Sequence, residues 1–440
     1  MQKTVGKQTV HLHIPATRSF LPLVLGFVRE GVQAFAFGQV ETDTLTLAAE
    51  EICGYLMNMQ QPSDTIDLSL TDGNWRIVLR IDCKSADMDL RAFNLTWRIS
   101  DDEESLEHMG LLLASRMVDR MTISSHKDRM QLCLVKHRSY PPVELPEADP
   151  APLHDGYRLI GEPPSEVFQY ALLQLQAHGI APLPSCFRNP LLDADMLAAG
   201  DLDATLACNA GGAVLGLVCR RWMSSRCVEL LGPYMLIDGD IGETIRIELV
   251  EDSLGRAART QAVGMICRHT QQAFTQHLFD TLGTLPETQA DGTTSLRPVY
   301  YRLLREDDGR TVYTDPVLTS FLKSTWERLT LPRILRQLPH PGGRGSAHSV
   351  LAVEFERDAS RCTLRLLQPG KDLKDNLKDH LRILRQEGIR NIVFEMDLGN
   401  TTDAAQASVL VASGFQPRLL IPDGGHGDLL LFTADMQEGQ

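Results

Sequence analysis

Apolar residues recur along this chain at spacings that predict short strands alternating with amphipathic helices. The most regular helix covers residues 372–387, where Leu373, Leu377, Leu381 and Leu384 form one stripe and charged side chains fill most other positions. Short apolar runs such as AVLGLVCR and CVELLGPYML are typical of buried strands. A chain that alternates such elements throughout is expected to fold as multidomain α+β or α/β.

The same patterns give an expected order of elements. Before residue 140 they predict helices over 18–35, 43–58 and 106–119, and strands over 65–71, 74–82, 120–125 and 130–137. After residue 200 they predict helices over 242–256, 372–387 and 402–413, and strands over 213–220, 227–237, 262–268, 349–356, 361–368, 390–398, 417–422 and 428–433.

A proline-rich segment divides the chain. Residues 141–152 contain five prolines with three carboxylates between them, and such a segment cannot continue a helix or a central strand. It prefers an extended, solvated conformation and acts as a spacer. The polar stretch TLPETQADGTTSLR marks a weaker break. We therefore predict a domain over 1–140, a linker over 141–154, and two modules over 155–290 and 297–435.

Composition narrows the class of protein. The 43 basic and 57 acidic residues leave a net charge of −14, which disfavours a protein that binds nucleic acid. No window of 18 uninterrupted apolar residues predicts a membrane span, and the N-terminus lacks the apolar stretch of a signal peptide. The nine cysteines lack zinc-ligand spacing, so we expect buried thiols and no metal site. These features together predict a cytoplasmic protein.

Residues 8–138 hold short motifs in a recognisable order. Glu51 lies in TLTLAAEEICGYLMN, Asp82 follows the apolar run WRIVLRI, and Gly110 lies in HMGLLLASRMVD. In this order the segment resembles the ATP-binding domain of the GHKL superfamily, in its anti-sigma-factor serine kinase branch. The resemblance implies an N-terminal α/β sandwich. It also implies that Glu51 activates the attacking hydroxyl, that Asp82 accepts a hydrogen bond from adenine, and that Gly110 opens a helix beneath the phosphates of ATP–magnesium.

Several positions of that family pattern are not retained. Tyr55 replaces the asparagine that binds magnesium, and Lys84 and Ala86 replace the two glycines after the aspartate. The Gly-x-Thr motif expected near SSHKDRMQLCLVK is absent. A phenol is a poor magnesium ligand, so we expect weakened or absent ATP turnover. Taken singly, the three retained residues also suit ordinary roles on a solvated helix face, in a turn and in a permissive backbone.

The chain after residue 155 resembles the GNAT acyltransferase family. The succession AVLGLVCRRW, CVELLGPYML and AVGMICRHT is followed by a second one, VLAVEFERD, CTLRLLQPG and IRNIVFEMDL. Phe415 completes a Gly-Phe pair where that family tends to show one. The resemblance implies one or two GNAT-like domains with mixed sheets.

In the GNAT family, backbone amides of a turn at a helix N-terminus bind the pyrophosphate of CoA. In the first module this turn is IDGDIGET, where Asp238, Asp240 and Glu243 would repel a pyrophosphate. In the second module the turn is QPGKDLKDN, where Gly370 and Lys371 open the helix and are the expected contacts of an acyl-CoA. An ordinary strand–helix turn is the alternative interpretation.

Together these features predict a bacterial cytoplasmic regulatory protein. A degenerate nucleotide-binding domain would contact a regulatory partner of the sigma-factor or anti-anti-sigma type, and the GNAT-like region would sense a small acyl or CoA-type ligand. Two enzymatic alternatives stay open: a serine protein kinase with Glu51 as its base, and an acyl-CoA-dependent N-acyltransferase. Because anti-sigma-kinase relatives tend to dimerise, the resemblance also implies a homodimer, with neither nucleic acid nor a membrane as a partner.

Overall fold

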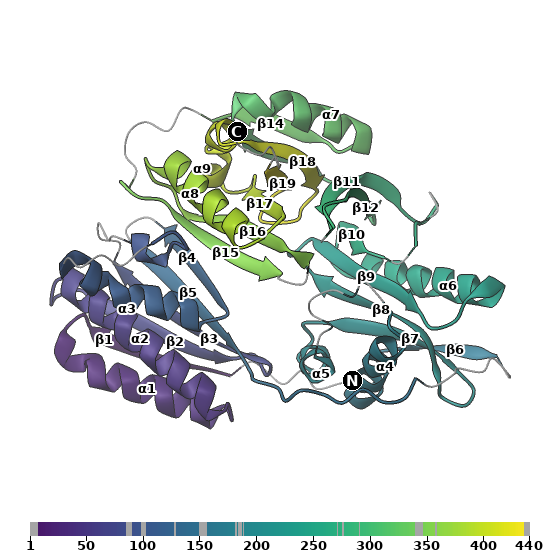
Figure 1. The fold of residues 1–440 in the computed structure, drawn as a ribbon, viewed down its shortest axis with the longest axis horizontal. Coiled ribbons are helices and arrows are strands. Elements are labelled where there is room, and N and C mark those ends of the chain that lie inside the picture. Colours follow the sequence, from purple (N-terminus) through teal and green to yellow (C-terminus); the bar gives the residue numbers. More distant parts are fainter. Residues whose placement is uncertain are drawn as a thin grey trace.

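The structure is a computed structural model of the 440-residue chain. It describes residues 8–84, 90–97, 103–126, 129–148, 156–180, 183, 187, 189–270, 272–274, 277–289, 291–338, 346–356 and 359–434. Figure 1 shows sheets with helices packed against them, and among the described residues no helix is long and apolar enough to cross a membrane.

The N-terminal unit, residues 9–137, is an antiparallel sheet covered by helices on one face. The sheet order is β1-β2-β3-β5-β4, and side chains alternate along β2 and β3 between the buried helix-covered face and the open face. The strands are β1 (Thr9–Pro15), β2 (Thr65–Asp72), β3 (Arg76–Lys84), β4 (Arg120–His126) and β5 (Arg129–His137); the helices are η1 (Arg18–Phe20), α1 (Leu21–Ala34), α2 (Gln39–Met59), η2 (Arg91–Phe93) and α3 (Glu103–Met117).

Residues 157–303, here named the first repeat, form a seven-stranded sheet in the order β11-β12-β10-β9-β8-β7-β6. Helices α4 and α5 share a core with one face of the sheet, and α6 shares a core with the other. The strands are β6 (Tyr157–Gly161), β7 (Asp203–Asn209), β8 (Val214–Trp222), β9 (Cys227–Met235), β10 (Gly264–His269), β11 (Asp280–Thr288) and β12 (Thr294–Leu303); the helices are α4 (Ser165–Ala177), α5 (Pro190–Ala198) and α6 (Gly239–Ala258).

Residues 310–434, the second repeat, form a five-stranded sheet in the order β15-β16-β17-β19-β18 and a separate parallel pair, β13 with β14. The strands are β13 (Arg310–Thr314), β14 (Arg333–Gln337), β15 (Val350–Glu356), β16 (Arg361–Gln368), β17 (Asn391–Asp397), β18 (Phe415–Ile421) and β19 (Leu429–Ala434); the helices are η4 (Pro316–Leu318), α7 (Thr319–Leu329), α8 (Leu373–Gln386), α9 (Thr401–Ala404) and α10 (Ala407–Ala412).

The two repeats have the same topology over five strands. In the first, β8 pairs antiparallel with β9, β9 pairs parallel with β10 across helix α6, and the hairpin β11–β12 joins antiparallel through β12. In the second, β15, β16, α8, β17 and the hairpin β18–β19 follow in the same order and directions. The chain therefore contains an internal structural repeat.

The expectation of a multidomain α/β chain with mixed sheets is confirmed, but two local predictions are wrong. The helix expected over 402–413 is divided into α9 and α10. The polar stretch expected as a break near 284–297 lies in the hairpin β11–β12, so the sheet of the first repeat extends to Leu303 and passes the predicted module end at 290.

A tryptophan connects the N-terminal unit to the first repeat. Trp75 lies in the β2–β3 turn, is 7% exposed, and belongs to the same buried cluster as Phe168 and Leu172 of α4. Its indole N–H donates to Asp201 Oδ2 at 2.7 Å, and the Arg76 guanidinium lies 4.5 Å from the ring centre. We call this contact the Trp75 joint.

An asparagine connects the N-terminal unit to the second repeat. Asn94, in the segment between β3 and α3, donates to Ser349 O at 2.8 Å and accepts from Leu351 N–H at 2.9 Å. It also accepts from the Asn376 amide of α8 at 3.2 Å. Leu95 packs against the core of the second repeat, and Val350 belongs to the core of the N-terminal unit. Each of the two parts therefore inserts a side chain into the core of the other. We call this contact the Asn94 joint.

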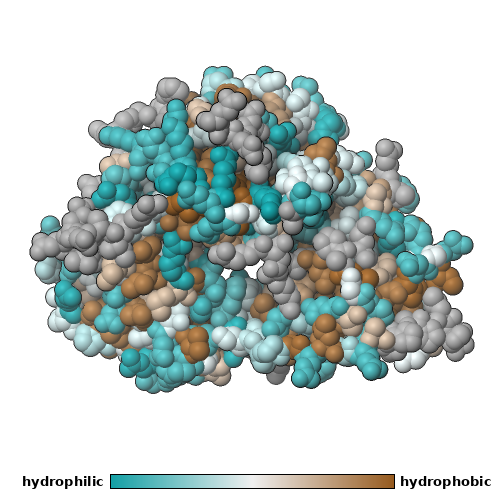
Figure 2. All heavy atoms as spheres, viewed as in Figure 1, coloured by the Kyte–Doolittle hydropathy of each residue, from teal (hydrophilic) through white to brown (hydrophobic). Residues whose placement is uncertain are grey.

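The two repeats share a hydrophobic core between their sheets. Leu419 and Leu431 of the second repeat lie in one buried cluster with Leu282 and Val299 of the first. The Asn391 side chain accepts from Thr288 N–H at 2.8 Å and donates to Thr288 O at 3.0 Å. Figure 2 shows a narrow opening near the middle of the molecule, where the N-terminal unit and the two repeats come together.

A buried carboxyl group next to the Trp75 joint makes stability depend on pH. Asp193 of α5 is 0% exposed, neither of its oxygens has a hydrogen-bond partner, and burial raises its pKa to about 8. Because this pKa lies above the unfolded value of about 3.9, folding takes up a proton and the free energy of unfolding falls as the pH rises from about 4 to about 8.

We expect the substitution Asp193→Asn to remove this slope and to raise the free energy of unfolding at pH 8, because no charge is then buried. Urea unfolding at several pH values measures the effect. The matched control is Asp308→Asn at an exposed carboxylate, which should leave the slope unchanged. An unaltered slope in Asp193→Asn would show that other groups cause it.

Candidate functional site

Two of the residues assigned to a nucleotide site lie together, although not as expected. The Glu51 carboxylate of α2 lies directly against the backbone of Gly110, so closely that a Cβ on Gly110 would overlap it. Helix α3 begins at Glu103, so Gly110 lies in the middle of the helix rather than at its start. Its amide therefore belongs to the helix interior, and the prediction that Gly110 opens a helix under phosphates is wrong.

Asp82 lies on the other face of the sheet. Its neighbours along β3, Ile81 and Cys83, are fully buried on the helix-covered face, and the alternation of side chains turns Asp82 to the open face. There its carboxylate accepts from Gln131 Nε2 of β5 at 3.0 and 3.1 Å. The structure therefore does not bring Asp82 together with Glu51.

The described residues of the N-terminal unit do not fit an ATP–magnesium site. Ile81 occupies the inward position on β3, and Tyr55 packs against the hydrophobic core where the family has an asparagine. Within the described ranges, no group of three or more His, Cys, Asp or Glu side chains is placed to hold a metal ion. Ala86 lies outside the described residues.

The turn before α6 in the first repeat carries negative charge. Asp238 is the N-cap residue, and it and Asp240 are exposed at the start of the helix. The Glu243 carboxylate is paired with Arg246 at 2.7 Å through two hydrogen bonds, so this arginine is already engaged. The geometry agrees with the sequence-based expectation that a pyrophosphate is disfavoured here.

The turn before α8 in the second repeat is covered by the chain itself. The Lys371 N–H donates to Ser346 O at 3.1 Å, and a Cβ on Gly370 would overlap the backbone of His348 and Ser349. Asp372 accepts from Ser349 N–H at 2.6 Å. Gly370 is therefore required for close packing of two backbone segments, and the Lys371 amide predicted to meet a CoA pyrophosphate is occupied. The residues of this turn do not fit that group.

A glutamate between the repeats, which sequence reasoning missed, is held as an ion. Glu229 of β9 is 0% exposed and accepts from Arg221 and Arg268, each at 2.8 Å. Burial alone would raise the pKa of Glu229, but the two guanidinium groups hold it far below its usual range. A carboxylate fixed in this way cannot take up a proton near neutral pH, so it does not serve as a general base.

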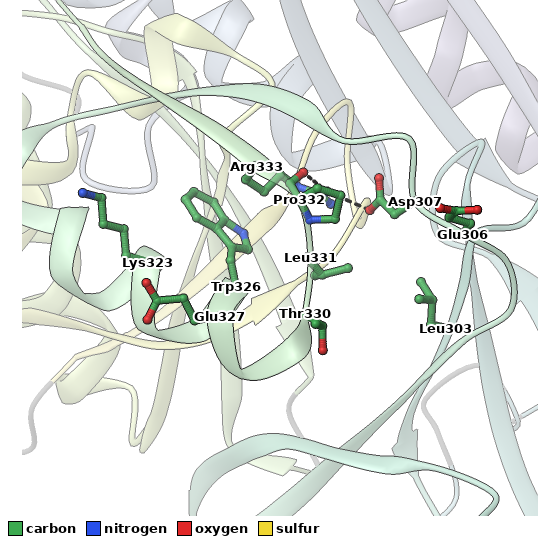
Figure 3. A pocket seen from close by; sticks show the side chains of 10 residues that line it. All are labelled: Leu303, Glu306, Asp307, Lys323, Trp326, Glu327, Thr330, Leu331, Pro332 and Arg333. Carbon is green, nitrogen blue, oxygen red and sulfur yellow. Dashed lines mark hydrogen bonds and ion pairs between the residues drawn. The ribbon is translucent and has the colours of Figure 1, made fainter.

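A cleft of about 720 Å³ opens where the connector between the repeats meets α7. Figure 3 shows Lys323 and Glu327 at one end, Leu303 and Glu306 at the other, and Arg333 reaching Asp307 between them. Its lining residues are Leu303, Glu306, Asp307, Lys323, Trp326, Glu327, Thr330, Leu331, Pro332 and Arg333. With three carboxylates and two cations, this cleft favours a neutral or cationic group over a phosphate.

The floor of this cleft is a buried ion network. The Arg333 side chain is fully buried and donates to Asp428 at 3.0 and 3.1 Å and to Asp307 at 2.7 Å. Trp326 Nε1 also donates to Asp428, at 2.9 Å. Asp428 is the last residue of the segment PDGGHGD, which forms the turn between β18 and β19. The ion pair between Asp428 and Arg333 therefore anchors this turn to β14.

Comparisons with known proteins find weak structural matches to part of the chain. No family model matches, and no curated protein matches. Among solved structures, a putative acetyltransferase from Acinetobacter baylyi ADP1 is 15% identical, covers 34% of this chain and 97% of its own, and has a TM-score of 0.29. An aminoglycoside 6'-acetyltransferase type Ii (12% identity, 34% and 98% coverage, TM-score 0.27) and a GNAT-family acetyltransferase from Staphylococcus aureus Mu50 (15%, 34% and 100%, 0.25) also match. These similarities assign no activity to the chain.

Proposed function

We propose that this chain is a non-catalytic regulatory protein in which an N-terminal binding unit is coupled to two GNAT-like repeats. The sequence order of the motifs around Glu51, Asp82 and Gly110 supports a GHKL-like N-terminal unit, and in this proposal the unit contacts a regulatory protein partner. The single observation that carries the proposal is the Asn94 joint, because it fastens the segment between Asp82 and Gly110 directly to the second repeat.

The chemistry of the candidate sites supports a role without catalysis. Asp82 and Glu51 lie on different faces of their sheet, so they cannot act on one nucleotide. Glu229 is neutralised by two arginines, and the Lys371 amide is occupied by Ser346. Buried polar contacts such as these fix the relative positions of the elements that they join. They leave no unpaired acid, base or anion-binding amide at Glu229 and Lys371.

Titration with acetyl-CoA and with ATP–magnesium tests this proposal. Calorimetry on the full chain measures binding, and assays for free thiol and for inorganic phosphate measure turnover. We expect no turnover of either compound. Release of CoA from acetyl-CoA would support the N-acyltransferase alternative, and phosphate transfer to a protein partner that disappears in Glu51→Ala would support the kinase alternative.

The substitution Asn94→Ala is expected to loosen the Asn94 joint without unfolding the chain. It leaves Leu351 N–H without its partner, at a cost of roughly 1–3 kcal/mol for a buried group, while Ser349 O keeps the hydrogen bond from Asn376 at 3.1 Å. Hydrogen–deuterium exchange should become faster in residues 90–97 and 349–351 and stay unchanged in β7 and β8.

Two further variants serve as controls for the exchange measured in Asn94→Ala. Asn94→Asp keeps the acceptor but loses the donor, so its exchange should be intermediate, and Asn58→Ala, at an exposed position on α2, should match the wild type. Unchanged exchange across the joint in Asn94→Ala would mean that these hydrogen bonds do not couple the two parts.

A further inference from the structure

An arginine-lined cavity lies in the first repeat, away from both turns considered above. It has a volume of about 300 Å³ and lies between the end of β8, the start of β9 and the C-terminal end of α6. This volume is at the small end of the range of roughly 300–1,000 Å³ found for ligand pockets. The lining residues are Glu162, Asp203, Arg220, Arg221, Trp222, Val228, Arg256, Ala257, Arg259 and Thr260.

Arg220 is a buried cation without a counter-ion. It is 5% exposed, and its Nη1 donates to Thr205 Oγ1 and to Ser253 Oγ, both at 3.0 Å. No carboxylate of the described residues lies within ion-pair distance of this guanidinium, and burial lowers its pKa. A buried charge is costly unless an opposite charge meets it, and here two neutral hydroxyl groups hold it against the cavity.

Asp203 lies opposite Arg220 in the register of β7 and β8, beyond ion-pair distance, and its charge favours the charged form of Arg220. The other nearby carboxylates are engaged with other arginines. Asp252 accepts from Thr205 at 2.8 Å and from Arg256 Nε at 2.7 Å. Glu162 lies 3.5 Å from Arg256 and is 73% exposed in its side chain, so screening makes this pair weak. Glu229 is shared between Arg221 and Arg268.

The wall of the cavity carries four arginines and two carboxylates. Arg256 and Arg221 are paired with Asp252 and Glu229, so Arg220 and Arg259 are the two lining cations with no ion pair among the described residues. Arg256 and Arg259 lie near the C-terminal end of α6 and also complement its negative end. That explanation does not apply to Arg220 on β8. Trp222, the residue at the end of the same strand, is 40% exposed and presents an aromatic ring at this cavity.

We propose that this cavity binds the phosphate group of a small phosphate monoester. Arg220 and Arg256 contact the phosphate oxygens, since planar guanidinium groups suit phosphate geometry, and Arg259 adds charge at the rim. The Trp222 ring covers the organic part of the ligand. This binding involves no covalent step and does not depend on acyl or phosphoryl transfer.

The experiment is a thermal-shift and calorimetric titration of the full chain with inorganic phosphate and with phenyl phosphate, against potassium chloride of equal ionic strength. We expect both phosphates to raise the melting temperature and chloride not to, with phenyl phosphate binding more tightly. An equal rise with chloride, or no binding of either phosphate, would overturn the proposal.

Arg220→Met separates ligand binding from a structural role. Thr205 keeps Asp252 as a partner and Ser253 keeps Leu249 O, so no buried polar group is left unpaired. We expect an unliganded melting temperature equal to or above that of the wild type, and phosphate binding weakened about tenfold or more. Phosphate binding that survives this substitution contradicts the assignment.

Two exposed variants keep the test decisive if Arg220→Met folds poorly. Arg259→Ala should weaken the binding of both phosphates several-fold without changing the unliganded melting temperature. Trp222→Ala should remove the advantage of phenyl phosphate and leave inorganic phosphate binding unchanged. Arg336→Met, at an exposed arginine on β14, is the matched control and should bind as the wild type does. Failure of Arg259→Ala to alter affinity would place the phosphate elsewhere.

Discussion

Replacing Trp75 with alanine is expected to release the N-terminal unit from the first repeat. The indole ring is buried in the cluster around Phe168, and its N–H donates to Asp201, so truncation removes both a large apolar contact and a charge-assisted hydrogen bond. Truncating a buried tryptophan costs about 3–5 kcal/mol in free energy. We expect faster hydrogen–deuterium exchange in the β2–β3 turn and in α4, and faster proteolysis of the proline-rich segment after Tyr140.

Two controls separate the parts of this effect. Trp75→Phe keeps an aromatic ring but loses the hydrogen bond to Asp201, so it should lose roughly 1.5–3 kcal/mol at most. Leu296→Ala removes an exposed apolar side chain from β12 and should leave exchange and proteolysis unchanged. If Trp75→Ala exchanged as slowly as the wild type, the Trp75 joint would contribute little to holding the two parts together.

Replacing Arg333 with methionine is expected to destabilise the second repeat and its contact with the connector that precedes it. The substitution keeps an apolar stem but leaves Asp307 and Asp428 buried with no cation, and removing one partner of a buried ion pair costs about 3–5 kcal/mol. A buried carboxylate that has lost its cation is costly in its charged form, and this cost is relieved when a proton is taken up. The free energy of unfolding lost in the variant should therefore be larger at pH 8 than at pH 5.

Urea unfolding at both pH values measures this difference, with Arg336→Met on the same strand as the control. Arg336 is exposed, so its variant should unfold as the wild type does at either pH. A deficit of Arg333→Met that does not shrink at pH 5 would mean that lost packing, rather than unpaired carboxylates, causes it.

The sequence pattern was a good guide where one face of an element is buried. Helix α8 was predicted because its leucines recur with helical spacing, and β16 and β17 because their apolar runs are short and bounded. It failed where partners outside the element decide the structure. The polar hairpin β11–β12 pairs along its length, and Glu287 in it binds Arg297 and Arg361; no local periodicity reports these contacts.

The candidate site was harder to predict than the fold. Motif order assigned Glu51 and Gly110 to one site, and the structure places these two residues in contact. Motif order could not tell which face of β3 carries Asp82, because a shift of one residue reverses every side chain of a strand. The backbone that packs on Gly370 belongs to His348 and Ser349, which lie outside the motif QPGKDLKDN, so the motif alone does not predict this contact. The sequence did not predict a role for Arg220, because only the folded structure shows that its side-chain partners are the hydroxyl groups of Thr205 and Ser253.

The Trp75 joint, the Asn94 joint and the shared core of the repeats close a ring. In an open row of three bodies, each contact must hold its own pair together. In a ring, any one contact forms between surfaces that the other two already keep near each other, at the high effective concentration of an intramolecular encounter. A few hydrogen bonds at Asn94 therefore suffice to keep the Asn94 joint formed. A molecule that separates the surfaces at one of the three contacts also weakens the other two, because it removes the constraint that holds their surfaces near each other.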